Sequence, residues 1–259
     1  MIRDRLKRLF SQRGVLKNIV LKEIKAKYSS SLLGIAWALI TPLLITIVVS
    51  FIFTKIMRME IKHFPLFVLS AIFPWMCFSA SLFDAANSIV KNSHLLNQFV
   101  ISREILPIAA VLANFVNFSF GLVVILPIFM VFKIQIMPVL LLLPFVIFLH
   151  LIFTVGIGLF LSCVNVFFRD VINLLEVSLM FWIWMTPIFY SIDMVPLNFR
   201  WIFALNPMTS YIAMYRNILF EAKIPSIGMI FIASGMSLSA LIVGYVTFTK
   251  YEGSFLKKI

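Results

Sequence analysis

Residues 105–132 read ILPIAAVLANFVNFSFGLVVILPIFMVF, an apolar run that contains no Asp, Glu, Lys or Arg. A hydrocarbon layer about 30 Å thick is crossed by roughly 20 helical residues, because each residue of an α-helix rises about 1.5 Å. Backbone polar groups in lipid must be paired within the protein, and a helix pairs them within a single segment. The run is therefore predicted to be a membrane-spanning helix.

Five further runs share this character, and together the runs take up most of the 259 residues. Hydrophobic residues make up 62% of the chain and charged residues 12%, and the mean hydropathy of +1.07 exceeds what a soluble core of this length needs. The predicted fold class is an all-α integral membrane protein with six transmembrane helices. We expect these helices at Leu32–Phe53, Leu66–Val90, Ile105–Phe132, Met137–Cys163, Val171–Phe189 and Ile227–Thr249.

The distribution of Lys and Arg predicts that both ends of the chain are cytoplasmic, because basic residues beside a span resist translocation. Residues 1–31 are rich in Lys and Arg, and Lys250, Lys257 and Lys258 follow the last span. The expected organisation is a cytoplasmic interface segment (1–31), a six-span domain (32–249) and a cytoplasmic tail (250–259). This topology, with anionic lipid headgroups, accounts for the net charge of +12 without a nucleic-acid partner.

The segment before the first span is amphipathic. Val15, Ile19 and Ile24, with Leu16 and Val20 beside them, form a broad apolar stripe at helical spacing among lysines. We expect this helix to lie along the cytoplasmic membrane surface, where each basic residue adds about 1 kcal/mol of attraction to an anionic leaflet. Simple topological anchoring and contact with a soluble partner both remain open as its role.

Polar residues inside the predicted spans are a further clue, because an unpaired charge there costs a few kcal/mol. Asp84 and Glu176 lie near the inner ends of their spans, where water or a neighbouring Lys or Arg would compensate them. Asn114 and Asn117 share one helical face and suit an interhelical contact. Packing is favoured over a proton path, since these residues and His150 form no evident relay.

The segment between the last two predicted spans is too long and too apolar for a plain connector. A short helical pattern begins at Asn198 and must stop at Asn206-Pro207, because a residue before proline avoids helical geometry. Pro207 then begins a second helix, capped by Asn206, that continues to about Phe220. The two helices are predicted to form a re-entrant hairpin in the outer leaflet. Their aromatic rings fit either an interfacial belt or a lid over a pore that stacks on sugars.

No catalytic, cofactor-binding or metal-binding residues are expected in this chain. A phosphate-binding loop needs a glycine followed by lysine, and none of the nine glycines is so placed. The two cysteines, Cys77 and Cys163, lie within spans, and no His or Cys pairing has metal-ligand spacing. Any ATP hydrolysis must occur in another chain.

Four groups of residues, in this order and spacing relative to the spans, resemble one known family. The family comprises the membrane subunits of ABC-2-type exporters of cell-surface polysaccharides, such as O-antigen, capsule and teichoic acid. The groups are Lys22–Tyr28 with Leu33-Gly34, Trp37-Ala38 and Thr41-Pro42; Asn97–Val100 with Arg103–Pro107; Phe168–Asp170 with Thr186–Ile188 and Tyr190; and Leu205–Pro207.

The resemblance implies a homodimer in the bacterial cytoplasmic (inner) membrane, with two copies of a separate ATPase docked beneath. ATP and Mg belong to that partner, and the other partners are membrane lipids and the polysaccharide. It places ATPase coupling in the inner loop, on Ser93, Leu96, Asn97, Gln98, Phe99, Arg103 and Glu104. It makes about Val15–Tyr28 the interface helix, including Lys22, Glu23, Lys25, Lys27 and Tyr28.

The resemblance also makes the outer hairpin, about residues 198–220, a gate. The pore or gate candidates are Trp182, Trp184, Phe189, Tyr190, Trp201, Asn206, Pro207, Tyr211 and Tyr215. Within the same class, an ABC-2 permease for a drug or lipid is the alternative. An ion-coupled secondary transporter is less favoured, because the sequence shows neither a convincing repeat nor a central pair of carboxylates.

Overall fold

The computed structural model describes residues 11–29, 34–98, 101–132 and 138–258, and all regular secondary structure in these ranges is helical. The starts of the first and fourth predicted spans, at Leu32 and Met137, and the coupling candidate Phe99 lie outside the described residues. The main helices are α2 (Arg13–Tyr28), α3 (Trp37–Phe51), α4 (Phe64–Lys91), α5 (Ser93–Gln98), α6 (Ile105–Phe132), α7 (Leu143–Phe167), α8 (Val171–Trp184), α9 (Arg200–Leu205), α10 (Pro207–Arg216) and α11 (Ile227–Tyr251). The short 3₁₀ helices are η1 (Gly34–Ala36), η4 (Val139–Leu142), η5 (Ile192–Met194), η6 (Leu197–Phe199) and η8 (Glu252–Lys257), and the short π-helices are η2 (Ile52–Ile56) and η7 (Asn217–Glu221).

Five helical segments in the described residues are long and apolar enough to cross a membrane, which confirms five of the six predicted spans. They are Trp37–Ile56, Phe64–Lys91, Ile105–Phe132, Val139–Phe167 and Ile227–Phe255. The remaining predicted span, Val171–Phe189, is wrong in its end point, because α8 has 14 residues and stops at Trp184. Pro187 explains the early end, since the residue before a proline avoids the helical region. At 1.5 Å per residue α8 is only about 21 Å long.

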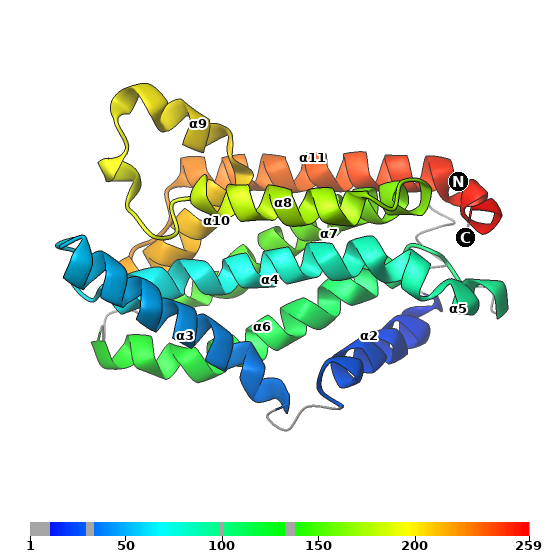
Figure 1. Cartoon of the computed structure of the whole chain (residues 1–259), viewed down its shortest axis with the longest axis horizontal. Helices are drawn as coiled ribbons and strands as arrows, with labels where there is room; N and C mark the ends of the chain where they lie inside the picture. The colour runs from blue at the N-terminus through cyan, green and yellow to red at the C-terminus, as the bar shows by residue number, and fades with distance from the viewer. Residues whose placement is uncertain (1–10, 30–33, 99–100, 133–137, 259) are drawn as a thin grey trace.

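The long helices run roughly side by side along the longest axis of the molecule (Figure 1). We call the end that carries α2, α5 and η8 the α2 end, and the opposite end, beside α9, the α9 end (Figure 1). In its apolar 18-residue stretch 72% of the residues of α4 are buried, against 17% for α3 and for α11. The helix α4 is therefore the central element, and α3 and α11 leave much apolar surface for lipid or another protein.

The backbones of α7 and α11 approach each other closely, and these two helices share the most extensive contact of any pair in the described residues. A Cβ atom at Gly244 would overlap the backbone of Gly156, and one at Gly156 would overlap the backbone at Ala240. Small residues allow membrane helices to pack this closely, and van der Waals contact then holds them together. These two glycines therefore set the spacing of the pair.

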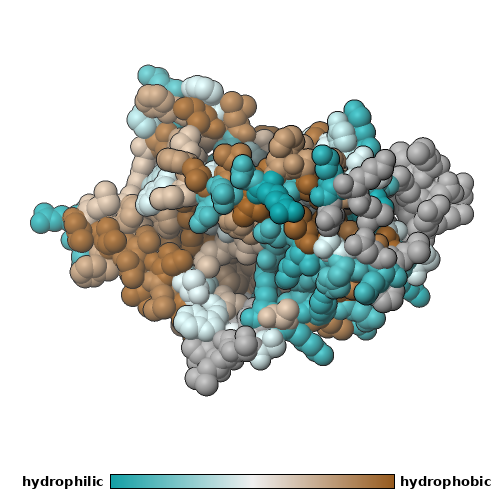
Figure 2. All heavy atoms as spheres, turned by 45° about the vertical axis from the view of Figure 1, so that its right-hand side comes forward, coloured by the Kyte–Doolittle hydropathy of each residue, from teal (hydrophilic) through white to brown (hydrophobic). Residues whose placement is uncertain are grey.

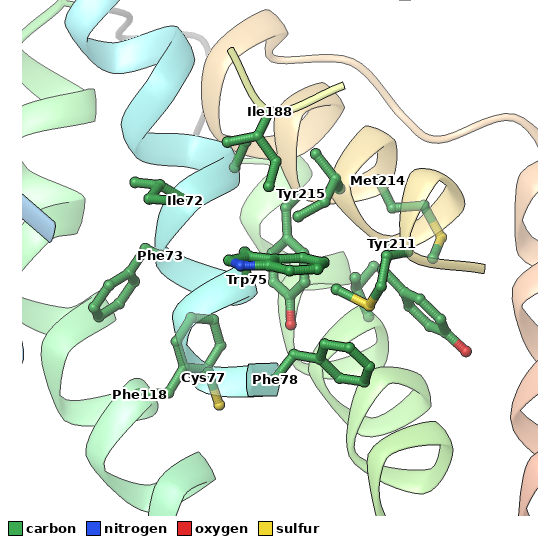
Figure 3. Close-up of a cluster of buried hydrophobic side chains, with 14 of the residues drawn as sticks. Ile72, Phe73, Trp75, Cys77, Phe78, Phe118, Ile188, Tyr211, Met214 and Tyr215 are labelled. Atoms are coloured by element: carbon green, nitrogen blue, oxygen red, sulfur yellow. The ribbon is translucent and has the colours of Figure 1, made fainter. Parts of the chain in front are cut away.

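The main apolar core surrounds α4 and is rich in aromatic rings (Figure 3). Phe73 of α4 and Phe118 of α6 lie on one side, whereas Tyr211 and Met214 of α10 lie on the other (Figure 3). A second apolar cluster occupies the α2 end and joins Ile19, Leu96 and Phe255 with residues of α4, α6, α7 and α11. Hydrophilic side chains gather on the surface around α2, whereas the far end of that face is mainly hydrophobic (Figure 2).

Candidate functional site

A triangle of polar contacts fixes α2 to α4 and α6. The Lys27 ammonium lies 2.7 Å from Asp84 Oδ2 and donates a hydrogen bond to Asn114 Oδ1 at 2.5 Å. Asn114 Nδ2 donates to the same Asp84 oxygen at 2.8 Å. The carboxylate that the sequence placed near the end of a span is thus paired with a lysine, as expected. Each member satisfies the other two, which lowers the cost of placing a charge near the membrane interior.

A second set of contacts joins α2 to the end of α4. Glu23 is 9% exposed, and its carboxylate lies 3.3 Å from the ammonium of Lys91. Lys22 donates to Asn92 Oδ1 at 3.1 Å, and Asn92 donates in turn to the carbonyl oxygen of Ser88 at 3.0 Å. Three of the predicted interface residues, Lys22, Glu23 and Lys27, therefore hold α2 in place. Lys25 is exposed, and Tyr28 is the last residue of α2.

The loop before α6 is tied to both described ends of the chain. The backbone amide of Ser102 donates to Gln12 Oε1 at 3.0 Å, and Arg103 Nη1 donates to the carbonyl oxygen of Glu252 in η8. Glu104 is buried at 3% exposure. The loop that was predicted to receive movement from a partner is thus in direct contact with α2 and η8.

Ser93–Gln98, which include most of the predicted coupling residues, form the short helix α5. Leu96 is buried in the second apolar cluster, Ser93 is half-buried and Gln98 is exposed. Asn97 lies within α5. The helix therefore has an anchored side and a side that is available to another protein.

Asn206 makes four side-chain hydrogen bonds between α8 and α10. Its Oδ1 accepts from the amide of Met208 at 3.0 Å, which confirms the predicted cap of the helix that begins at Pro207. The same oxygen accepts from Trp182 Nε1 at 2.7 Å. Its Nδ2 donates to Met185 O and to Thr186 Oγ1, both at 2.9 Å. The sequence predicted the cap but not the three contacts to the end of α8.

Two pore or gate candidates on α10 lie in the core. Tyr211 and Tyr215 are both 0% exposed. The Tyr211 hydroxyl lies 2.6 Å from Ser237 Oγ and donates to the carbonyl oxygen of Ala233 at 3.0 Å, whereas the Tyr215 hydroxyl lies 3.3 Å from His150 Nδ1. In this conformation their rings pack α10 against α7 and α11 and do not face an aqueous path.

The other candidates are distributed between the surface and the end of α8. Trp184 and Trp201 are 56% and 61% exposed, whereas Phe189 is buried. The Tyr190 hydroxyl donates to the carbonyl oxygen of Trp184 at 2.6 Å, and partial burial raises the pKa of Tyr190, so the phenol stays a neutral donor at physiological pH.

Arg216, at the end of α10, makes structural contacts that were not predicted from the sequence. Its guanidinium lies 3.7 Å from the centre of the Phe67 ring and donates to the carbonyl oxygen of Ile188 at 3.1 Å. These contacts join α10, α4 and the segment after α8. An arginine in so apolar a segment is itself a signal, since a buried charge requires partners. Which partners it would meet could not be read from the sequence.

No metal centre appears in the described part of the chain, where no three His, Cys, Asp or Glu residues are grouped to hold an ion. Cys77 and Cys163 are both buried free thiols.

These features define a multi-pass, all-helical membrane protein with an amphipathic helix docked at one end of the bundle. The chain belongs to the ABC-2 type transporter family, whose model matches residues 15–220. It is 31% identical over 239 residues to an O-antigen export system permease protein RfbA of Klebsiella pneumoniae, covering 90% of each chain. It is 29% identical over 256 residues to an O-antigen export system permease protein RfbA of Myxococcus xanthus, covering 98% of each.

Proposed function

We propose that this chain is the membrane permease of an ATP-driven exporter that moves a cell-surface polysaccharide, such as a lipid-linked O-antigen, across the bacterial cytoplasmic membrane. The similarity to O-antigen export permeases over nearly the whole chain supports the cargo class. A separate ATPase, with its own ATP and Mg, would supply the energy. The observation that carries the mechanism is the polar attachment of α2 to α4 and α6, beside the loop that carries α5.

The α2 end has the properties of a docking platform. The contacts of Lys27, Glu23 and Lys22 join α2 to two spans. The loop before α6 contacts Gln12, just before α2, through Ser102, and it contacts η8 through Arg103. A push on the exposed side of α5 would therefore move α2, α4 and α6 together. Rigid-body motion of this kind is a common way for a local contact to reach a distant gate.

The exposed side of α8 supports a second copy of the chain as the other partner. Glu176 is exposed on the surface of this apolar helix, and a charge that faces lipid is costly. After Trp184 the backbone continues as turns through Tyr190, and lipid does not tolerate irregular backbone within its hydrocarbon region. In a homodimer of six-span subunits, α8 would serve as the fifth span and face the second subunit and a polar pathway.

The outer hairpin, α9 and α10, would then act as the gate. Asn206 joins its two helices and fixes both to the end of α8, so movement of α8 would be transmitted to the hairpin. Trp184 and Trp201 expose aromatic rings that a sugar could stack on.

Deleting the gene tests the cargo: surface glycan should disappear while lipid-linked polymer accumulates inside the cell. Normal surface glycan would refute the polysaccharide assignment. Docking is tested with Gln98→Glu on α5, which should reduce copurification of the ATPase and export together. Asn198→Glu is the matched control for ATPase copurification, because it also places a carboxylate on an exposed amide position, but at η6, outside the α2 end. Only copurification is compared between the two variants, since Asn198 belongs to the proposed gate and its substitution can change export by itself. Equal effects of the two substitutions would argue against α5 as the docking helix.

A further inference from the structure

A pocket of about 180 Å³ lies between α2, α3, α4 and α6, apart from α5 and the outer hairpin. Its polar part is formed by Lys27, Asn114 and Asn117, and its apolar part includes Phe73, Met76 and Phe118. The gate does not use this space, and the coupling mechanism uses Lys27 and Asn114 only to fix α2 to α4 and α6.

Asn117 supplies a hydrogen-bonding group without a protein partner. Its residue is 7% exposed, and its Oδ1 is buried and accepts no hydrogen bond. A buried acceptor left without a donor costs about 1–3 kcal/mol, so a ligand that donates a hydrogen bond here would recover part of that cost. Asn117 lines the pocket, so a ligand group that reaches its Oδ1 must be a hydrogen-bond donor.

The charges around the pocket argue against an anionic ligand. Lys27 is already paired with Asp84 at 2.7 Å and donates to Asn114 as well. A phosphate would have to displace this carboxylate or lie beside it, and like charges in close proximity repel. A phosphodiester also has no hydrogen to donate to Asn117. A hydroxyl group meets both conditions, because it is neutral and can donate.

The apolar part of the pocket suits the C–H face of a ring. The rings of Phe73 and Phe118 lie with their centroids 5.0 Å apart and their planes tilted by 38°. Phe73, Phe118 and Cys77 lie on the same side of the α4 core (Figure 3). Gly121 makes room for the Phe73 ring, since a Cβ atom there would overlap it.

We propose that this pocket binds the neutral, hydroxylated headgroup of a membrane lipid, such as the sugar ring of a glycolipid. A hydroxyl donates to Asn117 Oδ1, the ring lies against Phe73 and Phe118, and the lipid chains remain in the bilayer. Lys27 and Asp84 exclude anionic headgroups by their mutual pairing. The site is independent of the exported cargo and would exist whether or not the chain transports a polysaccharide.

Titration of monoglucosyl diacylglycerol into phosphatidylcholine nanodiscs that hold the purified protein tests this site. Native mass spectrometry should show saturable binding of the glycolipid, and Asn117→Leu should weaken it about fivefold to tenfold, the value of one buried hydrogen bond. Asn87→Leu is the matched control, because it removes a half-buried amide of α4 that only donates to the carbonyl oxygen of Phe83. The Asn87→Leu protein should bind the glycolipid as tightly as the unmodified chain does.

Cys77 provides a second readout that needs no change at Asn117, because its thiol lines the pocket. In the Cys163→Ala protein, the glycolipid should slow alkylation of Cys77, and absence of protection would overturn the proposal. Phosphatidylglycerol that binds more tightly than the glycolipid, and still binds after Asn117→Leu, would overturn it in favour of charge recognition. Protection by soluble glucose as strong as that by the glycolipid would assign the site to a free sugar and overturn the lipid assignment.

Discussion

Replacing Lys27 with methionine should loosen the attachment of α2 to the bundle, because it removes the cation of the polar triangle while keeping most of the length of the side chain. Asp84 would keep only the hydrogen bond from Asn114, and its charge would lose the ammonium that lies 2.7 Å away. The side chains of Lys27 and Asp84 are 29% and 36% exposed, so solvent screens the pair in part.

The expected loss of stability lies between two known limits. Breaking a solvent-exposed ion pair costs about 0–1 kcal/mol, and breaking a fully buried one costs about 3–5 kcal/mol. The partial exposure of this pair places the effect of Lys27→Met at about 1–2 kcal/mol. For a chain of this size each kcal/mol lowers the midpoint of thermal unfolding by about 2–4 °C, so a decrease of about 2–8 °C is expected.

The assay is thermal unfolding in nanodiscs, combined with hydrogen exchange of residues 13–28. Lys25→Met is the matched control, since Lys25 is an exposed lysine of the same helix. The double variant Lys27→Met with Asp84→Asn should recover part of the loss, because no unpaired charge remains. The reasoning is refuted if Lys27→Met and Lys25→Met have the same midpoint and the same exchange over α2.

Three further pairs of substitutions test the packing. Asn206→Ala should destabilise the protein by about 2–4 kcal/mol, because it removes a helix cap and the hydrogen bonds to partly buried groups at the end of α8. Asn206→Asp, which keeps the acceptor oxygen, should lose about half as much in thermal unfolding, and equal losses would contradict this. Gly244→Ala should destabilise by about 1–3 kcal/mol through overlap with α7. Gly235→Ala, at an open position of α11, should stabilise slightly because alanine favours helix, and the same sign for both would be inconsistent with the close helix contact. Leu96→Ala should cost about 2–3 kcal/mol locally and speed hydrogen exchange of α5, whereas the exposed Gln98→Ala should leave it unchanged; equal exchange would show that Leu96 does not anchor the helix.

Most of the fold could be predicted from the sequence, since long apolar runs without charges permit few structures in a membrane. The helices α4, α6 and α11 begin within two residues of their predicted starts. The error at α8 arose because hydropathy continues through Phe189 while Pro187 ends the helical geometry. Apolar composition is a property of the segment, whereas the end of a helix depends on single residues.

The candidate site was only partly predictable. The polar residues Asp84 and Asn114 were identified as exceptional within spans, and Asn206 was identified as a cap. The partner of Asp84 could not be predicted, because Lys27 is one of many lysines in a basic segment and its contact spans two loops. The aromatic rings of α10 fitted either an interfacial belt or a lid that stacks on sugars, whereas Tyr211 and Tyr215 lie in the core.

The sequence by itself determined the membrane class, the order of the helices, the amphipathic helix at the start and the resemblance that the family model confirmed. These depend on composition and on patterns within one segment, because the length of an apolar run and its helical spacing are enough to predict a helix and its environment. Only the tertiary structure decided that Lys27 meets Asp84, that Asn206 binds the end of α8 and that Asn117 faces a pocket. Such pairings depend on the rotation and spacing of packed helices, and these are set by contacts distributed over the whole core.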